Sequence, residues 1–379
     1  MKYILLVAAE NSAETYGLQV MQEYAEKHGP IHFWGVGGER LQRNGLEIVV
    51  PNRSLAVVGI VEVLIHLFRI KRVMNLLFRQ ALERRTAAAL LIDYPDFNLR
   101  LARRLSRAGI PVYYYISPTV WAWRYSRVEQ IRRWVTRLFI IFPFEVPIYQ
   151  KEKVTFSYTG HPLLDAVRVS EPRDQFRRRH GIGSDEILLA LLPGSRKSEV
   201  RSLLPEILGA VNLLHEEYKL KVFLQKAQDI DSTSLAAALS DPRIQLLEQD
   251  QGFNLLNAAD AVISTCGTSN LEAALLGAPF VAIYRVNRLT YLLGKRFIRI
   301  PLYSIVNILA GRRVVAELIQ KDCRAKPIFQ EIKKILDDRA WRQQMLEAFA
   351  GIRESLRQEQ KPAAIICRQI SADLASKET

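Results

Sequence analysis

An aspartate placed just before a proline turn is the residue of this sequence best suited to chemistry. Asp93 follows the apolar run at residues 87–92, which is too short for a stable isolated helix and is typical of a buried parallel strand. Pro95 cannot donate to a strand ladder, so the chain is expected to turn there. The pattern predicts Asp93 at the carboxyl end of a strand, where open α/β sheets bind ligands. A carboxylate in that position can accept a proton.

A strand–turn–helix corner in the second half of the chain has the composition of an anion site. The apolar run at residues 187–192 leads into Pro193, Gly194 and Ser195, and a helical pattern begins after Arg196. Gly194 permits close backbone approach, the helix N-terminus offers free N–H groups, and Arg196 can form two hydrogen bonds to a diphosphate. The alternative is a plain corner capped by Ser195. Anion binding is favoured because basic residues start a helix poorly unless an anion lies beside them.

A second corner repeats this design. The run at residues 261–265 is followed by Gly267 and by a helical pattern whose first turns include Thr268 and Glu272. Backbone amides there can bind phosphate, and Glu272 can accept hydrogen bonds from sugar hydroxyls. A helix capped by small polar residues is the alternative. Two such corners in one half of the chain indicate a site for a nucleoside diphosphate.

Tryptophans beside arginines follow another strand-like run at residues 112–116. Ser117 ends that run, and Trp123 directly precedes Arg124. Aromatic rings next to arginines can bind sugars, bases or a lipid interface, and packing of the rings in the core is the alternative. His161, in a Gly-His-Pro sequence, is a lesser candidate, because a lone histidine is commonly structural.

An apolar and basic stretch at residues 57–79 is typical of an interfacial helix. Helical spacing buries one face, but Ile65 and Phe68 fall outside that face and are accompanied by Arg69 and Arg72. Excess apolar surface next to basic residues suits a membrane interface. A fully buried core helix is the alternative interpretation.

The composition is that of a globular protein with an uneven positive charge. A length of 379 residues is enough for two domains. With 49% hydrophobic and 24% charged residues, the chain can form a core large enough to be stable without disulfides. The three cysteines lack metal-ligand spacing and indicate a reducing compartment. The formal net charge is +14, and residues 100–150 hold nine arginines against two glutamates, a local balance of +7. Such a segment suits phosphates, an anionic membrane surface or nucleic acid.

Strand-like and amphipathic stretches alternate along the chain, which is the pattern of α/β domains with parallel sheets. The apolar start of the chain is interpreted as a strand and not as a signal peptide, and no run is long enough to span a membrane. The charged segment at residues 170–180 is the predicted linker. We expect two doubly wound sheets facing a cleft, with strands at residues 3–8, 31–36, 88–92, 112–116, 138–142, 187–192, 221–224, 261–265 and 280–284.

Taken together, these motifs resemble the lipid-A-disaccharide synthase family of inverting glycosyltransferases, and the resemblance runs over nearly the whole chain. The order and spacing of the matching segments make it specific. They are GVGGER (35–40), VVGIVEVL (57–64), IDYPDFN (92–98), SPTVWAWR (117–124), FPFE (142–145), GHP (160–162), LPGSR (192–196) and NILAGR (307–312).

The resemblance implies a GT-B-type α/β fold with two Rossmann-like domains. Residues 1–170 would bind the acceptor and face the membrane, with C-terminal helices at 345–379 packing back on them, and residues 171–344 would bind the UDP-sugar donor. The implied reaction joins UDP-2,3-diacylglucosamine to 2,3-diacylglucosamine 1-phosphate. Its products are the β-1,6-linked lipid A disaccharide 1-phosphate and UDP.

The family motifs also imply roles for individual residues. The catalytic base falls on Asp93, the donor-binding arginine on Arg196 and a further donor-site asparagine on Asn307. Glu10 is assigned to catalysis together with Asp93. Ser12 is assigned to the acceptor side of the site with Ser117, Trp123 and His161.

The first loop departs from the family pattern. The family has Gly-Glu-Ala-Ser-Gly-Asp where this chain has Ala-Glu-Asn-Ser-Ala-Glu at residues 9–14. Glu10 and Ser12 are kept, but alanine replaces both glycines. If those glycines let the loop pass close to the substrate or take positive φ, alanine is expected to reshape the loop.

The resemblance implies no cofactor and no metal. The expected partners are the two lipid substrates and the anionic surface of the inner membrane, on whose cytoplasmic face the enzyme would lie as a peripheral protein, and no nucleic acid is expected. The alternatives are another UDP-sugar-dependent GT-B enzyme or an epimerase, and a non-catalytic basic protein that binds membranes or nucleic acid. The two anion corners and Asp93 argue against the last class, because a simple basic binder needs neither.

Overall fold

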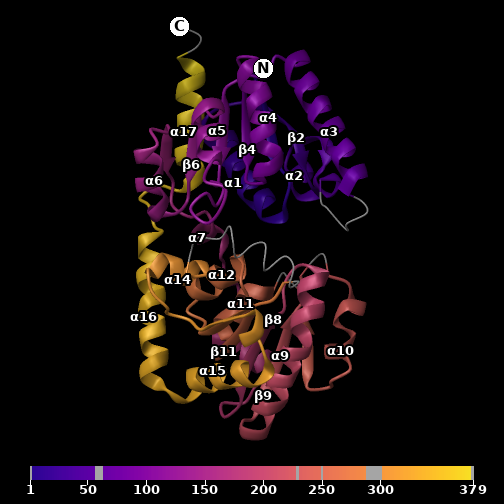
Figure 1. Cartoon of the computed structure of the whole chain (residues 1–379), viewed down its shortest axis with the longest axis vertical. Helices are drawn as coiled ribbons and strands as arrows, with labels where there is room; N and C mark the ends of the chain where they lie inside the picture. The colour runs from indigo at the N-terminus through magenta and orange to yellow at the C-terminus, as the bar shows by residue number, and fades with distance from the viewer. Residues whose placement is uncertain (1, 56–62, 228–229, 249–250, 287–300, 377–379) are drawn as a thin grey trace. The chain divides into compact units, whose positions relative to one another are not determined.

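The computed structural model describes residues 2–55, 63–227, 230–248, 251–286 and 301–376, without the side chains of residues 11 and 63–67. The chain forms two compact units (Figure 1). The first comprises Met1–Pro162 and Leu356–Thr379, and the second comprises Leu163–Ser355. Each unit contains one sheet, and the strand pairs that the structure describes are parallel.

The sheet of the first unit has the strand order β3-β2-β1-β4-β5-β6-β7. Its strands are β1 (Lys2–Ala8), β2 (Ile31–Gly37), β3 (Glu47–Pro51), β4 (Ala88–Ile92), β5 (Val112–Tyr115), β6 (Arg137–Ile140) and β7 (Phe156–Tyr158). The helices of this unit are α1 (Asn11–Lys27), α2 (Glu39–Arg43), α3 (Val63–Glu83), α4 (Pro95–Arg107), α5 (Arg127–Trp134), α6 (Val146–Lys151) and α17 (Pro362–Ala375).

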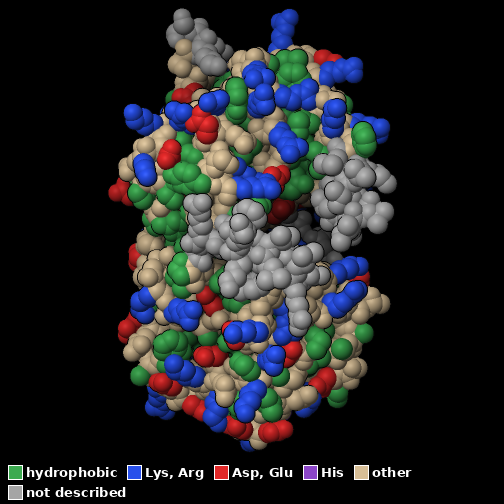
Figure 2. All heavy atoms as spheres, in the orientation of Figure 1, with side chains coloured by type: hydrophobic (Ala, Val, Ile, Leu, Met, Phe, Trp, Pro, Cys, Tyr) green, Lys and Arg blue, Asp and Glu red, His purple; other side chains and the backbone are tan. Residues whose placement is uncertain are grey.

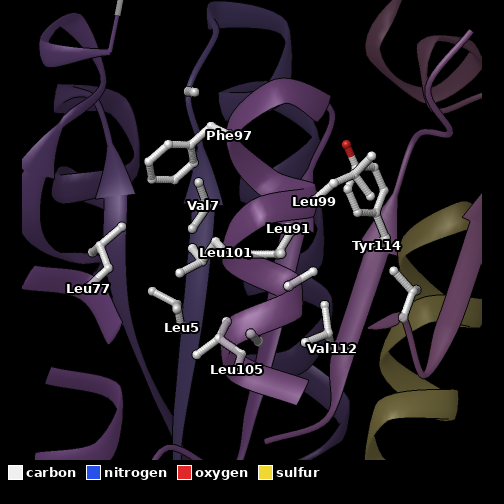
Figure 3. Close-up of a cluster of buried hydrophobic side chains, with 14 of the residues drawn as sticks. Leu5, Val7, Leu77, Leu91, Phe97, Leu99, Leu101, Leu105, Val112 and Tyr114 are labelled. Atoms are coloured by element: carbon white, nitrogen blue, oxygen red, sulfur yellow. The ribbon is translucent and has the colours of Figure 1, made fainter. Parts of the chain in front are cut away.

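Alternate residues of the central strands supply two apolar cores, one on each face of this sheet, because successive side chains of a strand point to opposite sides. One core contains Leu5, Val7 and Leu91, and it packs against α3, α4 and α5 (Figure 3). The other contains Leu6 and Ile92, and it packs against α1 and α17. Burial on both faces explains why these strands are apolar throughout.

The sheet of the second unit has the order β10-β9-β8-β11-β12-β13. Its strands are β8 (Ile187–Leu192), β9 (Leu220–Gln225), β10 (Ile244–Leu247), β11 (Ala261–Thr265), β12 (Phe280–Tyr284) and β13 (Glu317–Ile319). Its helices include α7 (Leu163–Ala166), α8 (Arg173–Arg179), α9 (Lys197–Glu217), α10 (Ala236–Leu239), α11 (Gly252–Ala258), α12 (Thr268–Leu275), α14 (Ile305–Ala310), α15 (Ala325–Asp337) and α16 (Arg339–Ser355).

Short 3₁₀ helices occur in both units. They lie at Asn52–Ser54 and Pro143–Glu145 in the first unit and at Ser232–Leu235 and Gln320–Asp322 in the second.

The chain returns to the first unit at its C-terminal end, where α17 packs on α1 (Figure 1). The Ser371 hydroxyl donates to the Tyr24 hydroxyl at 2.7 Å, and the Tyr113 hydroxyl donates to Asp373 at 2.9 Å. Helix α16 does not return with it. Phe349 of α16 is buried and stacks on Phe280 of β12, with ring centres 5.7 Å apart, so this helix belongs to the second unit.

The boundary between the units also differs from the predicted one. Residues 163–170 fall in the second unit, where the backbone N–H of Ser170 donates to Asn254 of α11 at 2.9 Å. The predicted linker at residues 170–180 contains helix α8, whose Phe176 is buried. The charges that suggested a linker include Arg173 and Arg177, which pair with Asp260 at 2.5 and 3.0 Å. Charged residues that fold into ion pairs of this kind do not mark a linker.

Candidate active site

Asp93 lies directly after β4 in an uncommon backbone conformation. Its φ is +48° and that of Tyr94 is +45°, and non-glycine residues rarely take positive φ. The Asp93 carbonyl oxygen accepts hydrogen bonds from the Tyr114 hydroxyl at 2.6 Å and from Asn98 Nδ2 at 2.7 Å. Helix α4 begins at once with Pro95, whose missing N–H is not needed in a first turn. Two hydrogen bonds to the Asp93 carbonyl oxygen, one from β5 and one from α4, therefore hold the strained turn in place.

The Asp93 carboxyl is a weaker acid than an ordinary aspartate. Burial raises the pKa of Asp93 to about 6, with a further rise from the Glu10 carboxylate and a smaller decrease from the Tyr94 N–H. Glu10 is close because Ala8 of β1 pairs with Ile92 of β4, so both carboxylates follow adjacent strands. The structure thus brings together the two residues predicted to be catalytic.

The altered first loop keeps ordinary backbone geometry. Neither Ala9 nor Ala13 has positive φ, and Ala13 is buried within α1. Ser12 is partly buried in the first turn of the same helix. Both alanines therefore take conformations open to any residue, and a change of loop shape relative to the family's glycines stays a prediction.

Glu14 is a buried carboxylate that the sequence analysis did not select. Asn52 Nδ2 and the backbone N–H of Gly38 donate to it, while burial raises its pKa. A side chain at Gly38 would begin 2.0 Å from Glu14 Oε1, so only glycine allows this contact. The GVGGER motif was the available signal, because an apolar strand that ends in glycines implies close approach by another group.

Ser117 is buried, and its hydroxyl points into the protein. Its Oγ donates to the Pro118 carbonyl oxygen at 2.9 Å and is hydrogen-bonded to the Tyr149 hydroxyl. Burial raises the pKa of the neighbouring Glu145 carboxyl to about 8, although bonds from the backbone and from Ser117 lower it. Ser117 therefore holds the loop after β5 in place and does not present its hydroxyl to an acceptor.

His161 is also buried, and burial lowers its pKa to about 3, so its imidazole is neutral. Its ring lies 5.2 Å from that of Phe142, and its backbone N–H donates to Leu356 at 3.3 Å. Gly160 takes a φ of +74°, and a side chain there would begin 2.7 Å from the Leu356 carbonyl oxygen. This Gly-His-Pro sequence supports the returning chain, which agrees with the structural interpretation of the histidine.

Trp123 is 38% exposed, with the guanidinium carbons of Arg124 and Arg127 at 4.2 and 5.3 Å from its ring centre. It is therefore not a core residue, and its polar neighbours are arginines.

The first predicted anion corner joins β8 to α9. Gly194 has a φ of +113°, and a side chain there would begin 2.8 Å from Glu199 Oε2. Arg196, not Ser195, precedes the first helical residue, so the interpretation of Ser195 as the cap is wrong. The Arg196 side chain is 71% exposed and donates to Glu199 at 2.8 Å. Both Ser195 and Arg196 are exposed at the helix start.

The second corner joins β11 to α12, and it lies beside the first because Ser264 of β11 pairs with Leu192 of β8. Gly267 and Thr268 are exposed at the helix start. Behind them, Asn270 Nδ2 donates to the Thr265 carbonyl oxygen at 2.8 Å and fixes the turn. Burial raises the pKa of Glu272 to about 7.

Asn307 has no hydrogen-bonding capacity left for a ligand. Its Oδ1 accepts from the N–H groups of Val314 and Val315 at 2.7 and 3.0 Å. Its Nδ2 donates to the Val315 carbonyl oxygen and to Glu317, both at 2.9 Å. The side chain is fully buried and all its donors and acceptors are used. The Asn307 amide therefore ties α14 to residues 314–317, and it is not available to contact the donor.

Helix α3 presents apolar and basic side chains to solvent. Phe68 is 75% exposed, and Arg69 and Arg72 are exposed beside it. Val73 and Leu77 form the buried face, while the side chain of Ile65 lies outside the described residues. Lysine and arginine side chains gather over α3, α4 and α5 (Figure 2). Within the described part of the chain, no helix is long and apolar enough to cross a bilayer.

Comparison with known proteins agrees with this arrangement. The family model for lipid-A-disaccharide synthetase matches residues 4–370. The chain belongs to the lipid-A-disaccharide synthase family. The synthase of Geobacter sulfurreducens is 40% identical over 355 residues, which cover 93% of this chain and 92% of that protein. The synthase of Myxococcus xanthus is 37% identical over 355 residues, which cover 93% of both.

Family membership confirms the chain as a glycosyltransferase of lipid A biosynthesis, so the alternative of a non-catalytic binder is wrong. Solved structures confirm the GT-B fold. MurG of Acinetobacter baumannii matches with a TM-score of 0.59 at 15% identity and covers 98% of this chain and 100% of its own. A putative UDP-N-acetylglucosamine 2-epimerase from Listeria monocytogenes matches with a TM-score of 0.68 at 14% identity, covering 100% and 97%. Because an epimerase shares the fold, the fold alone does not separate these activities; the synthase family model does.

Proposed function

We propose that this enzyme transfers 2,3-diacylglucosamine from UDP to the 6-hydroxyl of 2,3-diacylglucosamine 1-phosphate. The hydroxyl oxygen attacks C1 of the donor sugar on the face opposite UDP, the bond from C1 to the UDP oxygen breaks, and UDP leaves with the electron pair. The configuration at C1 inverts, which gives a β-1,6 linkage. The hydroxyl proton passes to a carboxylate of the protein.

The observation that carries this proposal is the environment of Asp93. Its pKa of about 6 leaves most of the carboxylate ionised at neutral pH, yet it binds a proton more readily than an ordinary aspartate does. Its strained turn is locked by Tyr114 and Asn98, which fixes the base relative to the sheet. Glu10 contributes through its negative charge, which raises the pKa of Asp93.

The donor would bind at the two corners of the second unit. The exposed N-termini of α9 and α12 offer backbone N–H groups to the diphosphate, and Arg196 adds a positive charge. In the free protein Arg196 pairs with Glu199, so diphosphate binding exchanges that carboxylate for a ligand of higher charge. Glu272 of α12 would accept hydrogen bonds from sugar hydroxyls. Charge grows on UDP as the glycosidic bond breaks, so these groups stabilise the transition state.

Both substrates carry acyl chains, so the enzyme must work at a membrane surface. Phe68 of α3 is exposed, and the exposed Arg69 and Arg72 follow it within one helical turn. These side chains support peripheral binding to the anionic cytoplasmic face of the inner membrane. We assign this contact to α3. The basic segment of α5 is a poorer candidate, because Arg132 and Arg133 both pair with Glu129.

The proposal is tested by product analysis. The purified full-length protein is incubated with UDP-2,3-diacylglucosamine and 2,3-diacylglucosamine 1-phosphate in detergent micelles containing EDTA. The expected products are the tetraacyl disaccharide 1-phosphate, detected by mass spectrometry, and one UDP per disaccharide. Release of UDP without disaccharide, or conversion of the donor to its epimer, would contradict the proposal.

A further inference from the structure

Two arginines share one carboxylate oxygen next to the proposed base. Arg124 Nη1 and Arg127 Nη2 both donate to Asp96 Oδ1, at 2.8 and 2.6 Å. Trp123 lies against both guanidinium groups. Two positive charges therefore face one negative charge, and the cluster carries a net positive charge.

Arg127 is unusual because its side chain is only 6% exposed. Among the described residues, the bond to Asp96 is the one hydrogen bond that its guanidinium makes, although an arginine has five N–H donors. Its other guanidinium N–H groups keep some contact with solvent, so they can donate to a ligand that reaches the cluster. Arg124 and Asp96 are 49% and 64% exposed, so a solute can reach the cluster.

The cluster lies beside Asp93. Asp96 is in the first turn of α4, three residues after Asp93. Tyr114 donates to the Asp93 carbonyl oxygen, and Arg127 is near enough to the same phenol to lower its pKa, although burial raises that pKa overall. In the strand order β1-β4-β5, Glu10 follows β1 on one side of Asp93. On the other side, β5 is followed by residues 116–126, which contain Arg124 and are called the arginine loop, and then by Arg127 at the start of α5.

The backbone of the arginine loop is also strained. Arg124 has a φ of +51°, and Ile116 at the start of the loop has a φ of +68°. Positive φ is a genuine outlier for a β-branched residue such as isoleucine. Strain of this kind is commonly kept where it places functional groups. In this conformation the Arg124 guanidinium carbon lies 4.2 Å from the centre of the Trp123 ring.

We infer that Arg124 and Arg127 bind the phosphate of the acceptor sugar, with Trp123 supporting them and Asp96 holding the pair when no acceptor is bound. The inference rests on the proposed function and adds a subsite to it. The attacking hydroxyl is attached through C6 to C5 and the phosphate is attached to C1, and these two ring carbons flank the ring oxygen, so one sugar would present both groups to neighbouring parts of the site. A phosphate dianion carries more charge than the Asp96 carboxylate and displaces it from the two guanidinium groups.

The test compares two acceptors that differ only in the phosphate. kcat/KM is measured at saturating donor for 2,3-diacylglucosamine 1-phosphate and for 2,3-diacylglucosamine. The parent enzyme is expected to prefer the phosphorylated lipid. Arg124→Ala should lower kcat/KM for that lipid roughly 10-fold, the usual scale of a lost charged hydrogen bond, and leave the other acceptor unchanged. Arg133→Ala, in helix α5 just after Arg124 and Arg127 and paired with Glu129, is the matched control and should keep the parent preference.

Arg127→Lys provides a second variant, because it keeps the charge and the pairing with Asp96 but loses the planar fork. It should reduce the preference for the phosphorylated acceptor while the thermal midpoint stays close to that of the parent. Equal losses for both acceptors in Arg124→Ala and Arg127→Lys would overturn the inference, since the arginines would then only hold the loop.

A phospholipid headgroup offers the same phosphate chemistry, so vesicle binding is measured in parallel. Arg124→Ala should bind phosphatidylglycerol–phosphatidylcholine vesicles as the parent does. Weaker vesicle binding with an unchanged acceptor preference would assign the arginines to the membrane and overturn the inference. A parent enzyme that forms no disaccharide from either acceptor would instead refute the proposed function, and the subsite with it.

Discussion

The two sheets end differently at the edges where ligands are expected. In the first unit, Asp93 and Tyr94 take positive φ although neither is glycine, and buried hydrogen bonds hold the turn. In the second unit the corresponding turns use glycine. Gly194 has a φ of +113°, and Gly267 is exposed with an extended φ of 176°.

The difference follows from what each edge must do under the proposed function. A base has to keep one carboxylate poorly solvated and in one place, so strain and burial are tolerated there. A diphosphate needs exposed N–H groups and a cation that can change partners, as Arg196 can. Under this proposal, the turn after β4 in the first unit accepts a proton, and the turns after β8 and β11 in the second unit bind the negative charge of a diphosphate.

The largest effect is expected from the base. Asp93→Asn removes the proton acceptor and should lower kcat by roughly 100-fold or more, while UDP affinity, measured by calorimetry, stays near that of the parent because the donor corners lie in the other unit. Asp185→Asn, at an exposed ion pair of the second unit, is the control. Near-parent turnover in Asp93→Asn would remove Asp93 from this role.

The same variant tests burial of the charge. The folded pKa of Asp93 is raised, so its stabilising contribution is present at low pH and is lost as pH rises through about 6. At pH 8 the variant should therefore melt at or above the parent temperature. A lower melting temperature at pH 8 would show that the ionised carboxylate stabilises the fold.

The next effect concerns the donor edge. Arg196→Ala should weaken UDP binding and turnover together, each by roughly 10-fold, because the charge acts on bound and leaving diphosphate. Arg196→Lys should restore only part of the loss, since lysine lacks the fork. Arg201→Ala is the control, because Arg201 is an exposed arginine in α9, the helix that Arg196 precedes. Unchanged UDP affinity in Arg196→Ala would mean that the donor binds elsewhere.

A smaller effect is expected in the pH profile. kcat/KM should rise with pH through about 6, as Asp93 ionises, and then level. Glu10→Gln removes a negative neighbour, so the pKa of Asp93 should fall and the rising limb should move to lower pH. Glu26→Gln, at an exposed position of α1, should leave the limb in place. A limb that does not move in Glu10→Gln would show that Glu10 does not tune the base.

The smallest effect is expected at the membrane. Phe68→Ser should weaken binding to anionic vesicles without lowering the melting temperature, because the ring is 75% exposed. Binding should also weaken as salt screens the nearby arginines. Leu239→Ser, at a residue 39% exposed in the second unit, should bind as the parent does. Equal losses in both variants would remove α3 as the docking element.

The sequence predicted the central strands well because both of their faces are buried. It missed β3, β7, β10 and β13, which are the edge strands of the two sheets and are three to five residues long. The residues of β7 and β13 are only partly buried. Such strands have neither a continuous apolar run nor a regular alternation to detect.

The positions of candidate residues at strand ends were predictable where a local motif fixed them. Asp93 could be placed after β4 because Pro95 follows it closely, and Gly194 and Gly267 could be placed at turns because each follows an apolar run. The partners of Ser117 and Asn307 could not be found in this way. Tyr149 lies 32 residues from Ser117 in the sequence. The Asn307 amide bonds to the backbone of Val314 and Val315, and no sequence pattern predicts that this segment folds back against α14.

The return of α17 to the first unit bears on how this protein is made. Residues 362–375 are synthesised after the whole of the second unit, yet they close one face of the sheet that contains β1. Domains commonly fold in order of synthesis, but here the N-terminal domain stays incomplete until translation of the whole C-terminal domain is over. Truncation after Ser355 leaves the second unit whole and opens the apolar face under Tyr24 and Tyr113, in the unit that holds Asp93. A stop codon after the second unit therefore damages the unit that is synthesised before it.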